Sequence, residues 1–194
     1  MKLENILEFA EMLNAFRRVE RVVYANGTDR LENDSEHSYH LAMLAWYIVS
    51  AEKLSLDRDL VLKYALVHDL VEVYAGDTYV YTTDTKHKEN KVSREHRALV
   101  RLKKEFPLGE DILTLVDQYE KREDRESRFV YALDKIQPVI QIYLDSGRIW
   151  KEKDVTWEML FEYKKDKVAL SPEVQPYFDE LMALLKAEEK ELFD

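Results

Sequence analysis

Helical periodicity is the feature that most constrains the fold of this chain, because apolar residues recur every three or four positions along most of its length. The spacing and the stop signals predict helices over about 2–23, 35–53, 57–74, 88–106, 110–121, 126–146 and 156–167, and a last helix after Pro172. Four glycines and four prolines are too few for the turns of a β protein of 194 residues. An all-α bundle of about seven to eight helices is therefore expected.

No segment between these helices has the composition of a linker, so residues 1–194 are expected to form a single domain. The chain contains no cysteine, which excludes disulfides and thiolate–metal sites and fits a reducing compartment. No apolar run approaches the ~20 residues of a membrane span, and the N-terminal segment is an amphipathic helix rather than a signal peptide. A cytoplasmic protein without a membrane partner is expected.

The net charge of -10 argues against binding to DNA or RNA, whose phosphates require a basic surface. A small anionic substrate would need local cations, such as a bound metal ion together with arginines. Arg17, Arg18 and Arg21 form the basic cluster best placed for this role.

Two histidines and two aspartates lie in apolar helical stretches and form a candidate metal site: His37, His68, Asp69 and Asp134. A carboxylate that faces a core needs a cation or several donors to offset its desolvation. Imidazole with carboxylate suits a divalent ion such as Mn, Co, Fe, Zn or Mg. Because adjacent residues of one helix point about 100° apart, His68 and Asp69 need other helices to complete the shell. A histidine hydrogen-bonded within the core is the alternative interpretation.

Two local features support this interpretation. Ser35 is the expected N-cap of the helix that carries His37. Pro138 follows Asp134 by four residues, and a proline clashes with the carbonyl four positions back, so we expect the helix to bend at Asp134. Between residues 77 and 87 the chain is rich in Tyr and Thr, which predicts an irregular loop beside the site.

Three sequence blocks resemble the HD-domain superfamily of metal-dependent phosphohydrolases. The blocks are Arg30-Leu-Glu-Asn33-Asp-Ser-Glu-His37-Ser, His68-Asp-Leu-Val-Glu72 followed by Gly76-Asp77, and Arg128-Phe-Val-Tyr-Ala-Leu-Asp134-Lys. They are most similar to the 5′-deoxynucleotidase branch, also described as oxetanocin-like or as the HD-domain-containing protein 2 group. The resemblance covers the metal-site core, about residues 15–145, while the C-terminal helices of about residues 150–194 carry no recognised motif.

The resemblance implies a homodimeric enzyme that removes phosphate from (deoxy)nucleoside 5′-monophosphates with one divalent ion. It implies the metal ligands His37, His68, Asp69 and Asp134. Glu72 would activate the attacking water or protonate the leaving oxygen. Asp77 would contact the sugar, and the residues after it would line the nucleoside pocket: Thr78, Tyr79 and Val80.

The family pattern also includes an arginine near the phosphate, usually followed closely by a tryptophan. Arg21 matches this position best and Arg18 is the second choice, with Val22 or Tyr24 in place of the tryptophan. Because the tryptophan is missing, the resemblance does not fix the selectivity for sugar and base.

Other functions remain open from the sequence. A related phosphohydrolase acting on nucleoside polyphosphates or on a signalling nucleotide is the main alternative. A di-iron oxygenase needs further histidine ligands, and a non-catalytic nucleotide-binding module would be expected to lack ligands or Glu72. His40, one turn from His37, is expected as a core or boundary histidine, with a place beside the metal ligands as the alternative. His87 and His96 are expected on the surface and offer no obvious second-metal ligand.

Overall fold

The computed structural model describes residues 1–81 and 90–194. The N-terminal elements are α1 (Leu3–Phe16), β1 (Glu20–Tyr24), β2 (Leu31–Asn33), α2 (Asp34–Ala51), α3 (Arg58–Val67) and α4 (Glu72–Ala75). The later elements are α6 (Lys91–Glu105), η1 (Pro107–Gly109), α7 (Glu110–Lys121), α8 (Arg125–Leu144), α9 (Arg148–Glu152), α10 (Trp157–Val168), α11 (Gln175–Ala187) and α12 (Glu189–Phe193). The all-α class is confirmed, and in the described residues eight of these helices have ten residues or more.

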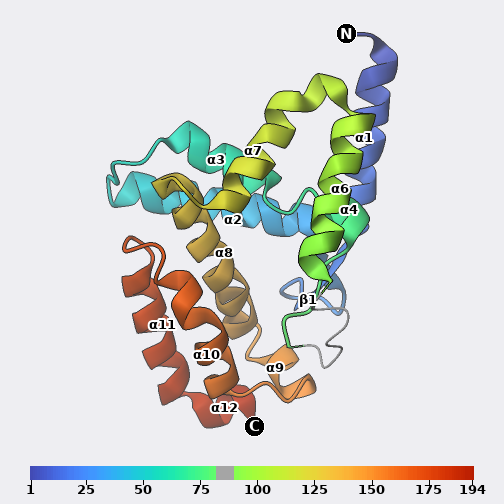
Figure 1. Ribbon diagram of the computed structural model, residues 1–194. Helices are drawn as coiled ribbons and strands as arrows, with labels where there is room; N and C mark the ends of the chain where they lie inside the picture. Colours follow the sequence, from blue (N-terminus) through green and yellow to red (C-terminus); the bar gives the residue numbers. More distant parts are fainter. Residues whose placement is uncertain (82–89) are drawn as a thin grey trace.

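Helix α8 is the central element of the molecule (Figure 1). Its buried side chains, among them Phe129, Leu133 and Ile136, contact α2 and α3 at one end and α10 and α11 at the other. A second apolar cluster joins α1, α6 and α7, with Leu102 and Val116 at its centre. Within the described residues, no helix is long and apolar enough to cross a bilayer.

The first expected helix, residues 2–23, is too long. Helix α1 ends at Phe16, and residues 20–24 form strand β1, which pairs antiparallel with β2. The strand contains Val22, Val23 and Tyr24, β-branched and aromatic residues that favour extended backbone. The sheet matters for the site because it carries Arg21.

The expected continuous helix over 57–74 is interrupted at the His-Asp pair. Helix α3 ends at Val67, and the next residues form a tighter turn whose amides bond three residues back, as from Leu70 N to Val67 O at 3.0 Å. His68 and Asp69 therefore lie in a turn between α3 and α4, not on one regular helix as expected. The tightened backbone resembles a 3₁₀ turn, which changes the angle between successive side chains.

Helix α2 begins one turn before His37. Asn33, not the expected Ser35, is its N-cap: the Asn33 Oδ1 atom accepts hydrogen bonds from the backbone amides of Ser35 and Glu36, both at 3.1 Å. The Glu36 side chain completes the capping box by accepting from the Asn33 amide at 3.2 Å. Because strand β2 ends directly at this cap, the start of α2 and the position of His37 are both fixed.

Candidate metal centre

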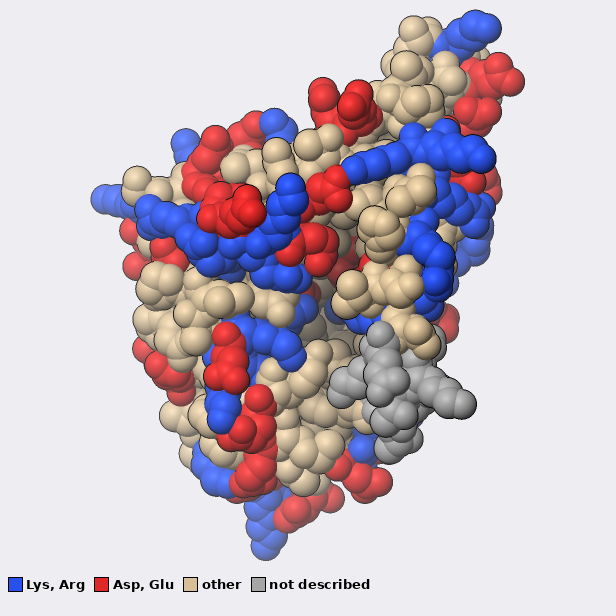
Figure 2. All heavy atoms as spheres, viewed as in Figure 1, with Lys and Arg blue, Asp and Glu red and all other residues tan. Residues whose placement is uncertain are grey.

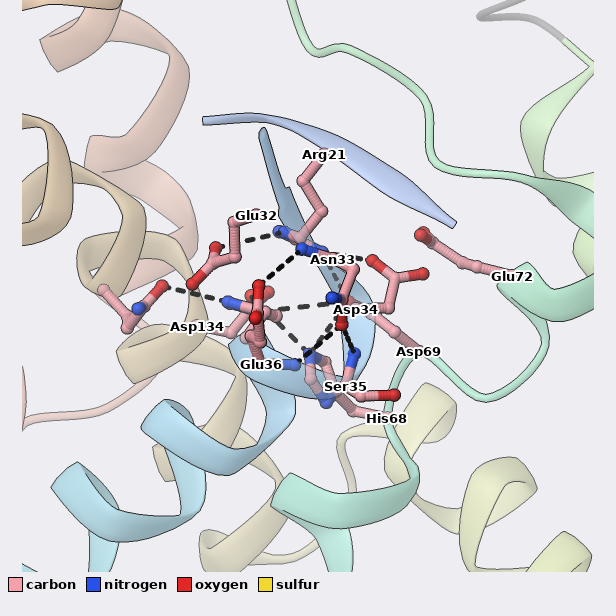
Figure 3. A network of polar contacts seen from close by, with 12 residues as sticks. Arg21, Glu32, Asn33, Asp34, Ser35, Glu36, His68, Asp69, Glu72 and Asp134 are labelled. Carbon is pink, nitrogen blue, oxygen red and sulfur yellow. Dashed lines mark hydrogen bonds and ion pairs between the residues drawn. The ribbon is translucent and has the colours of Figure 1, made fainter. Parts of the chain in front are cut away.

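The structure brings the four expected ligands together from α2, the α3–α4 turn and α8. Figure 3 shows three of them, His68, Asp69 and Asp134, converging on one place. One ligand atom from each of His37, His68, Asp69 and Asp134 lies within 4.8 Å of the other three. His37 Nε2 is 3.0 Å from Asp134 Oδ1, and His68 Nε2 is 3.0 Å from Asp69 Oδ2 and 3.7 Å from Asp134 Oδ1. Such separations suit four ligands around one ion, each about 2.0–2.3 Å from it.

Both histidine rings are held in orientation by a contact at Nδ1, on the side of the ring away from the carboxylates. His37 Nδ1 lies 2.9 Å from Oε1 of the buried Gln137, and His68 Nδ1 lies 3.0 Å from the backbone oxygen of Ala65. In both cases the Nδ1 hydrogen is donated outward, which leaves Nε2 as the ligand atom facing the carboxylates. Second contacts of this kind commonly fix the tautomer of metal-binding histidines.

His68 Nε2 shows that the donor set fits a metal ion. This buried nitrogen makes no hydrogen bond within the described residues, although the Asp69 carboxylate lies 3.0 Å away, because the geometry of that contact is unfavourable. A buried polar atom without a partner is costly, and a shared cation between the four groups would supply one. Two imidazoles with two carboxylates suit a borderline divalent ion.

The two imidazoles differ in their affinity for protons. Burial, with the nearby charge of Arg21, lowers the pKa of His37 to about 4. Burial also opposes protonation of His68, but the charges of Asp69 and Asp134 outweigh it and raise the pKa of His68 to about 10. His37 is therefore neutral at pH 7, while metal binding to His68 must displace a proton.

Arg21 points from strand β1 into this cluster (Figure 3). Its Nη1 atom donates to Asp34 Oδ1 at 3.1 Å and to Asp69 Oδ2 at 2.9 Å, and its Nε atom lies 3.9 Å from Glu32 Oε2. Burial raises the pKa of both Glu32 and Asp34 to about 7, despite the arginine beside them. Three carboxyl groups, those of Glu32, Asp34 and Asp69, thus surround the single guanidinium of Arg21.

The other expected arginines lie away from the cluster. The Arg18 side chain is 67% exposed, and within the described part of the chain its one ion pair is with Glu11, at 4.0 Å. Arg17 is the exposed residue that directly follows α1. Of the three arginines, only Arg21 approaches the four ligands.

Glu72 begins α4 and extends toward Asp69 (Figure 3). It is 3% exposed, and Lys91 Nζ lies 3.7 Å from its Oε1 atom. Burial, followed by the charges of Asp69 and Asp77, raises the pKa of Glu72 well above its usual value. A carboxyl group of this kind keeps its proton to a higher pH than an exposed glutamate does and is suited to acid–base chemistry.

A cavity of about 100 Å³ opens beside the cluster. Its lining combines Arg21 and Asp134 with all the expected substrate-contacting residues, Asp77, Thr78, Tyr79 and Val80. Val22 and Val23 of β1 and Tyr81 also line the cavity, and the rest of the wall comes from α8 and the helices after it: Lys135, Pro138, Val139, Ile142, Trp150, Leu160, Tyr163 and Lys164. The face seen in Figure 2 is hollowed near its middle, with acidic and basic side chains around the hollow.

The loop after Gly76 is held in place by α6. Thr78 is buried, and its Oγ1 atom accepts a hydrogen bond of 2.6 Å from Arg94 Nη2. Burial raises the pKa of Asp77. Val22 lines the cavity, whereas the Tyr24 hydroxyl donates to Glu152 Oε2 at 3.0 Å. The part of the loop at residues 82–89 lies outside the described residues.

Sequence reasoning missed several polar residues of the site. Glu32 and Asp34 lie within the first sequence block, and alternation along β2 would place Glu32 inward beside Arg21. Gln137 lies on the stripe of Asp134, one turn later. His40 is exposed, not in the core or at its boundary as expected, and its Nδ1 atom lies 3.4 Å from Glu32 Oε1. His96 is exposed, as expected, and His87 lies outside the described residues.

Comparisons with known proteins agree with this geometry. A family model described as HD domain matches residues 13–175. The chain is 30% identical to the 5′-deoxynucleotidase HDDC2 of Danio rerio, over 73% of this chain and 70% of that protein. It is 31% identical to the Homo sapiens protein of the same name, over 71% of this chain and 66% of that protein.

Among solved structures, one described as a predicted metal-dependent phosphohydrolase from Magnetospirillum magnetotacticum MS-1 superposes with a TM-score of 0.78 and 26% identity. The match covers 98% of this chain and 92% of that one. Because the family model spans most of the sequence and the matching structure has the same fold, the chain belongs to the HD-domain family.

Proposed function

We propose that this protein is a metal-dependent phosphohydrolase that removes phosphate from (deoxy)nucleoside 5′-monophosphates. The observation that carries the proposal is the position of the His/Asp cluster at one end of a cavity that also contains Arg21 and the Asp77–Val80 loop. The 5′-deoxynucleotidase names of the relatives from Danio rerio and Homo sapiens support the substrate class.

The proposed roles follow from the chemistry of each group. His37, His68, Asp69 and Asp134 would hold one divalent ion, which when bound polarises a phosphoryl oxygen and lowers the pKa of coordinated water. Arg21 would orient the phosphoryl group, since a guanidinium offers several N–H donors in a fixed fork. Arg18, the second choice from the sequence, is too exposed for this role.

Glu72 would transfer the proton that phosphate-ester hydrolysis requires. Its raised pKa lets the carboxyl group keep a proton to a higher pH than an exposed glutamate does and donate it to the leaving 5′ oxygen. Lys91, 3.7 Å away, stabilises the carboxylate that remains. Such assistance is necessary because phosphate monoesters hydrolyse extremely slowly in water.

Sugar recognition would fall to the cavity wall. Asp77 would contact the sugar, and Thr78, Tyr79 and Val80 would enclose it together with Val22. A wall packed against C2′ leaves an added hydroxyl crowded or without a hydrogen-bond partner, so deoxyribose should be preferred.

Phosphate release from a substrate panel tests the proposal. The panel contains the four deoxynucleoside 5′-monophosphates, dUMP, the matching ribonucleotides and dATP, each with Mn, Co, Zn or Mg. We expect higher kcat/KM for dAMP than for AMP and for dUMP than for UMP, and loss of activity after chelation. Hydrolysis of dATP without hydrolysis of any monophosphate would instead favour a polyphosphate substrate.

We further propose that the protein works in the cytoplasm as a homodimer and does not bind DNA or RNA. The absence of cysteine and the net charge of -10 support the first and last of these statements. The apolar C-terminal stretch with Leu181, Met182, Leu184 and Leu185 is poorly suited to self-association, because Met182 and Leu185 are buried in the core. The exposed face of α1 remains for self-association, with Leu3, Ile6 and Leu7.

A further inference from the structure

Lys164 is a buried lysine in the cavity of the metal cluster. It comes from α10, in the C-terminal region that matches no sequence motif, and it is only 7% exposed. Leu160 and Val168, one turn away on either side, are also buried, so the lysine interrupts an apolar stripe. Lysine is almost never fully buried unless it has a partner.

The Lys164 ammonium has little to offset its charge. Its Nζ atom donates to the backbone oxygen of Lys135 at 2.6 Å. Among the described residues, no carboxylate lies within ion-pair distance of it, the nearest aromatic ring being Tyr163 at 5.9 Å. Burial, together with the charge of Lys135, lowers the pKa of Lys164 to about 7.

The other cations of the cavity are already engaged. Arg21 lies among Glu32, Asp34 and Asp69, and Lys135 forms an ion pair with Asp134. An ammonium group has three N–H donors, and the backbone oxygen of Lys135 uses one of them. Lys164 is therefore the lining cation that can offer both charge and donors to a molecule entering the cavity.

We propose that Lys164 binds the phosphoryl group of the substrate, as a second cation that acts beside the metal centre. The inference rests on the proposed phosphohydrolase function and adds a residue from α10 to its site. A phosphate dianion approaching Asp69, Asp77 and Asp134 meets repulsion, which an ammonium group without a carboxylate partner offsets.

A phosphoryl group fits this position better than a nucleobase. A buried ammonium is stabilised most by an anion, whereas the edges of bases offer neutral acceptors. Lysine binds phosphate as a point charge, so it does not require the paired geometry that a guanidinium would. In the absence of phosphate the same residue is a buried charge that lowers stability.

Three variants test the proposal. Lys164→Met removes the charge with similar volume, Lys164→Gln keeps a donor for the Lys135 carbonyl, and Lys165→Met is the control on the same helix. Lys165 is partly exposed, with 38% of its side-chain surface accessible, and pairs with Glu162 at 2.6 Å. The measurements are kcat/KM for dCMP and for 2-deoxyribose 5-phosphate, calorimetric binding of inorganic phosphate to the metal-loaded protein, and thermal unfolding.

We expect both Lys164 variants to lose about 10- to 100-fold in kcat/KM on both substrates, as for one charge-assisted hydrogen bond. Phosphate binding should weaken by a similar factor, while the Lys165 variant stays within about twofold of the wild type. Lys164→Met should unfold at the same temperature as the wild type or higher, because a buried charge is replaced by an apolar group. If that variant does not fold, Lys164→Gln provides the same kinetic comparison.

Two results would overturn the proposal. A loss confined to dCMP, with 2-deoxyribose 5-phosphate unaffected, would assign Lys164 to the base, and unchanged kinetics with unchanged phosphate binding would leave it a structural residue. Failure of the proposed function looks different: the wild type would release no phosphate from any monophosphate. Lys164-dependent binding of inorganic phosphate in that case would still support the subsite.

Discussion

Each side chain of the metal cluster has a neighbour that determines its state. Gln137 and Ala65 orient the two imidazoles, Arg21 bonds Asp69, and Lys135 pairs with Asp134. These contacts keep the carboxylates ionised and direct both Nε2 atoms to the same point. The cluster is therefore preorganised, and the ligands need little rearrangement when an ion binds.

Separate losses of metal and of catalysis should distinguish the ligands from Glu72. We expect Asp69→Asn and Asp134→Ala to lose both bound metal and activity, because each removes a ligand of the cluster. Glu72→Ala should keep the metal and lose about 10²–10⁴ in rate, the usual contribution of a general acid or base. The metal content and turnover of the purified variants test these expectations, and Glu162→Ala, at an exposed position, is the control. Near-normal turnover by Glu72→Ala would remove Glu72 from the mechanism.

Glu32 makes stability depend on pH in a direction opposite to that of a salt-bridged carboxylate. Burial raises its pKa from 4.5 to about 7, so between these values the folded state binds more protons than the unfolded one. Stability from this group is fully present below pH 4.5 and is lost as the pH rises through 7.

The matching variant is Glu32→Gln, which imitates the protonated form. We expect it to stabilise the metal-free protein at pH 8 by on the order of 1–3 kcal/mol and to change little at about pH 4. Urea unfolding of both proteins across this range measures the difference. If the difference in the free energy of unfolding between the two proteins is the same at every pH, Glu32 is ionised in the folded state without cost.

At the scale of elements, Gly147 controls how the C-terminus packs. It follows α8 with a φ of 72°, and its amide donates to Ile142 O at 3.0 Å, closing the helix. A Cβ atom at this position would lie 2.2 Å from the backbone oxygen of Leu192 in α12. The glycine is therefore required both by its backbone conformation and by the close approach of α12.

Gly147→Ala should be strongly destabilising. We expect about 1–2 kcal/mol from the left-handed conformation and a larger total because the contacted atoms are backbone and must move. Gly27→Ala is the matched control: its φ is 77°, but a Cβ atom there would have nothing within 4 Å, so only the conformational cost applies. Thermal unfolding should show a larger decrease in Tm for Gly147→Ala than for Gly27→Ala. Equal decreases in Tm would contradict the packing role of Gly147.

The sequence predicted the helices better than it predicted their ends. Apolar periodicity places α2 and α8 correctly, because both bury a continuous stripe. It fails at residues 20–24 and at His68, where the apolar residues continue but the backbone changes to a strand or a tight turn. Those changes follow from pairing with β2 and from the convergence of the ligands, which are tertiary constraints.

The candidate site was predictable in part for the same reason. Ligand types, spacing and resemblance are enough to identify His37, His68, Asp69 and Asp134 from the amino-acid sequence. Nothing local in the sequence identifies Lys164 as a residue of the same cavity, since α10 meets α8 only in the folded chain. Its one signal is a lysine on an apolar stripe.

At the scale of the whole molecule, the C-terminal helices complete the site as well as the core. Trp150, Leu160 and Lys164 form part of the cavity, while Val174, Phe178 and Leu185 join the same core cluster as α2 and α8. Residues 1–194 as a single domain remains our proposal, and this shared packing supports it. The net charge of -10 makes the few cations of the cavity decisive for an anionic substrate.

Self-association should depend on α1. Leu3, Ile6 and Leu7 are 70%, 49% and 61% exposed, and a groove between α1 and η1 adjoins them. An exposed apolar surface of this kind is stabilised by a second copy packed about a two-fold axis. We therefore expect Leu7→Glu to convert the proposed dimer to a monomer without lowering the unfolding temperature of the fold.

The competing surface is the face of α2 around Trp46, which is 49% exposed beside Tyr47 at 72%. Trp46→Glu is the comparison variant, with the mass in solution at micromolar concentration as the measurement. Dissociation by Leu7→Glu alone places the interface on α1, because a charge buried there without a partner disfavours association. Dissociation by Trp46→Glu alone would move the interface to α2, and a monomeric wild type would reject the dimer altogether.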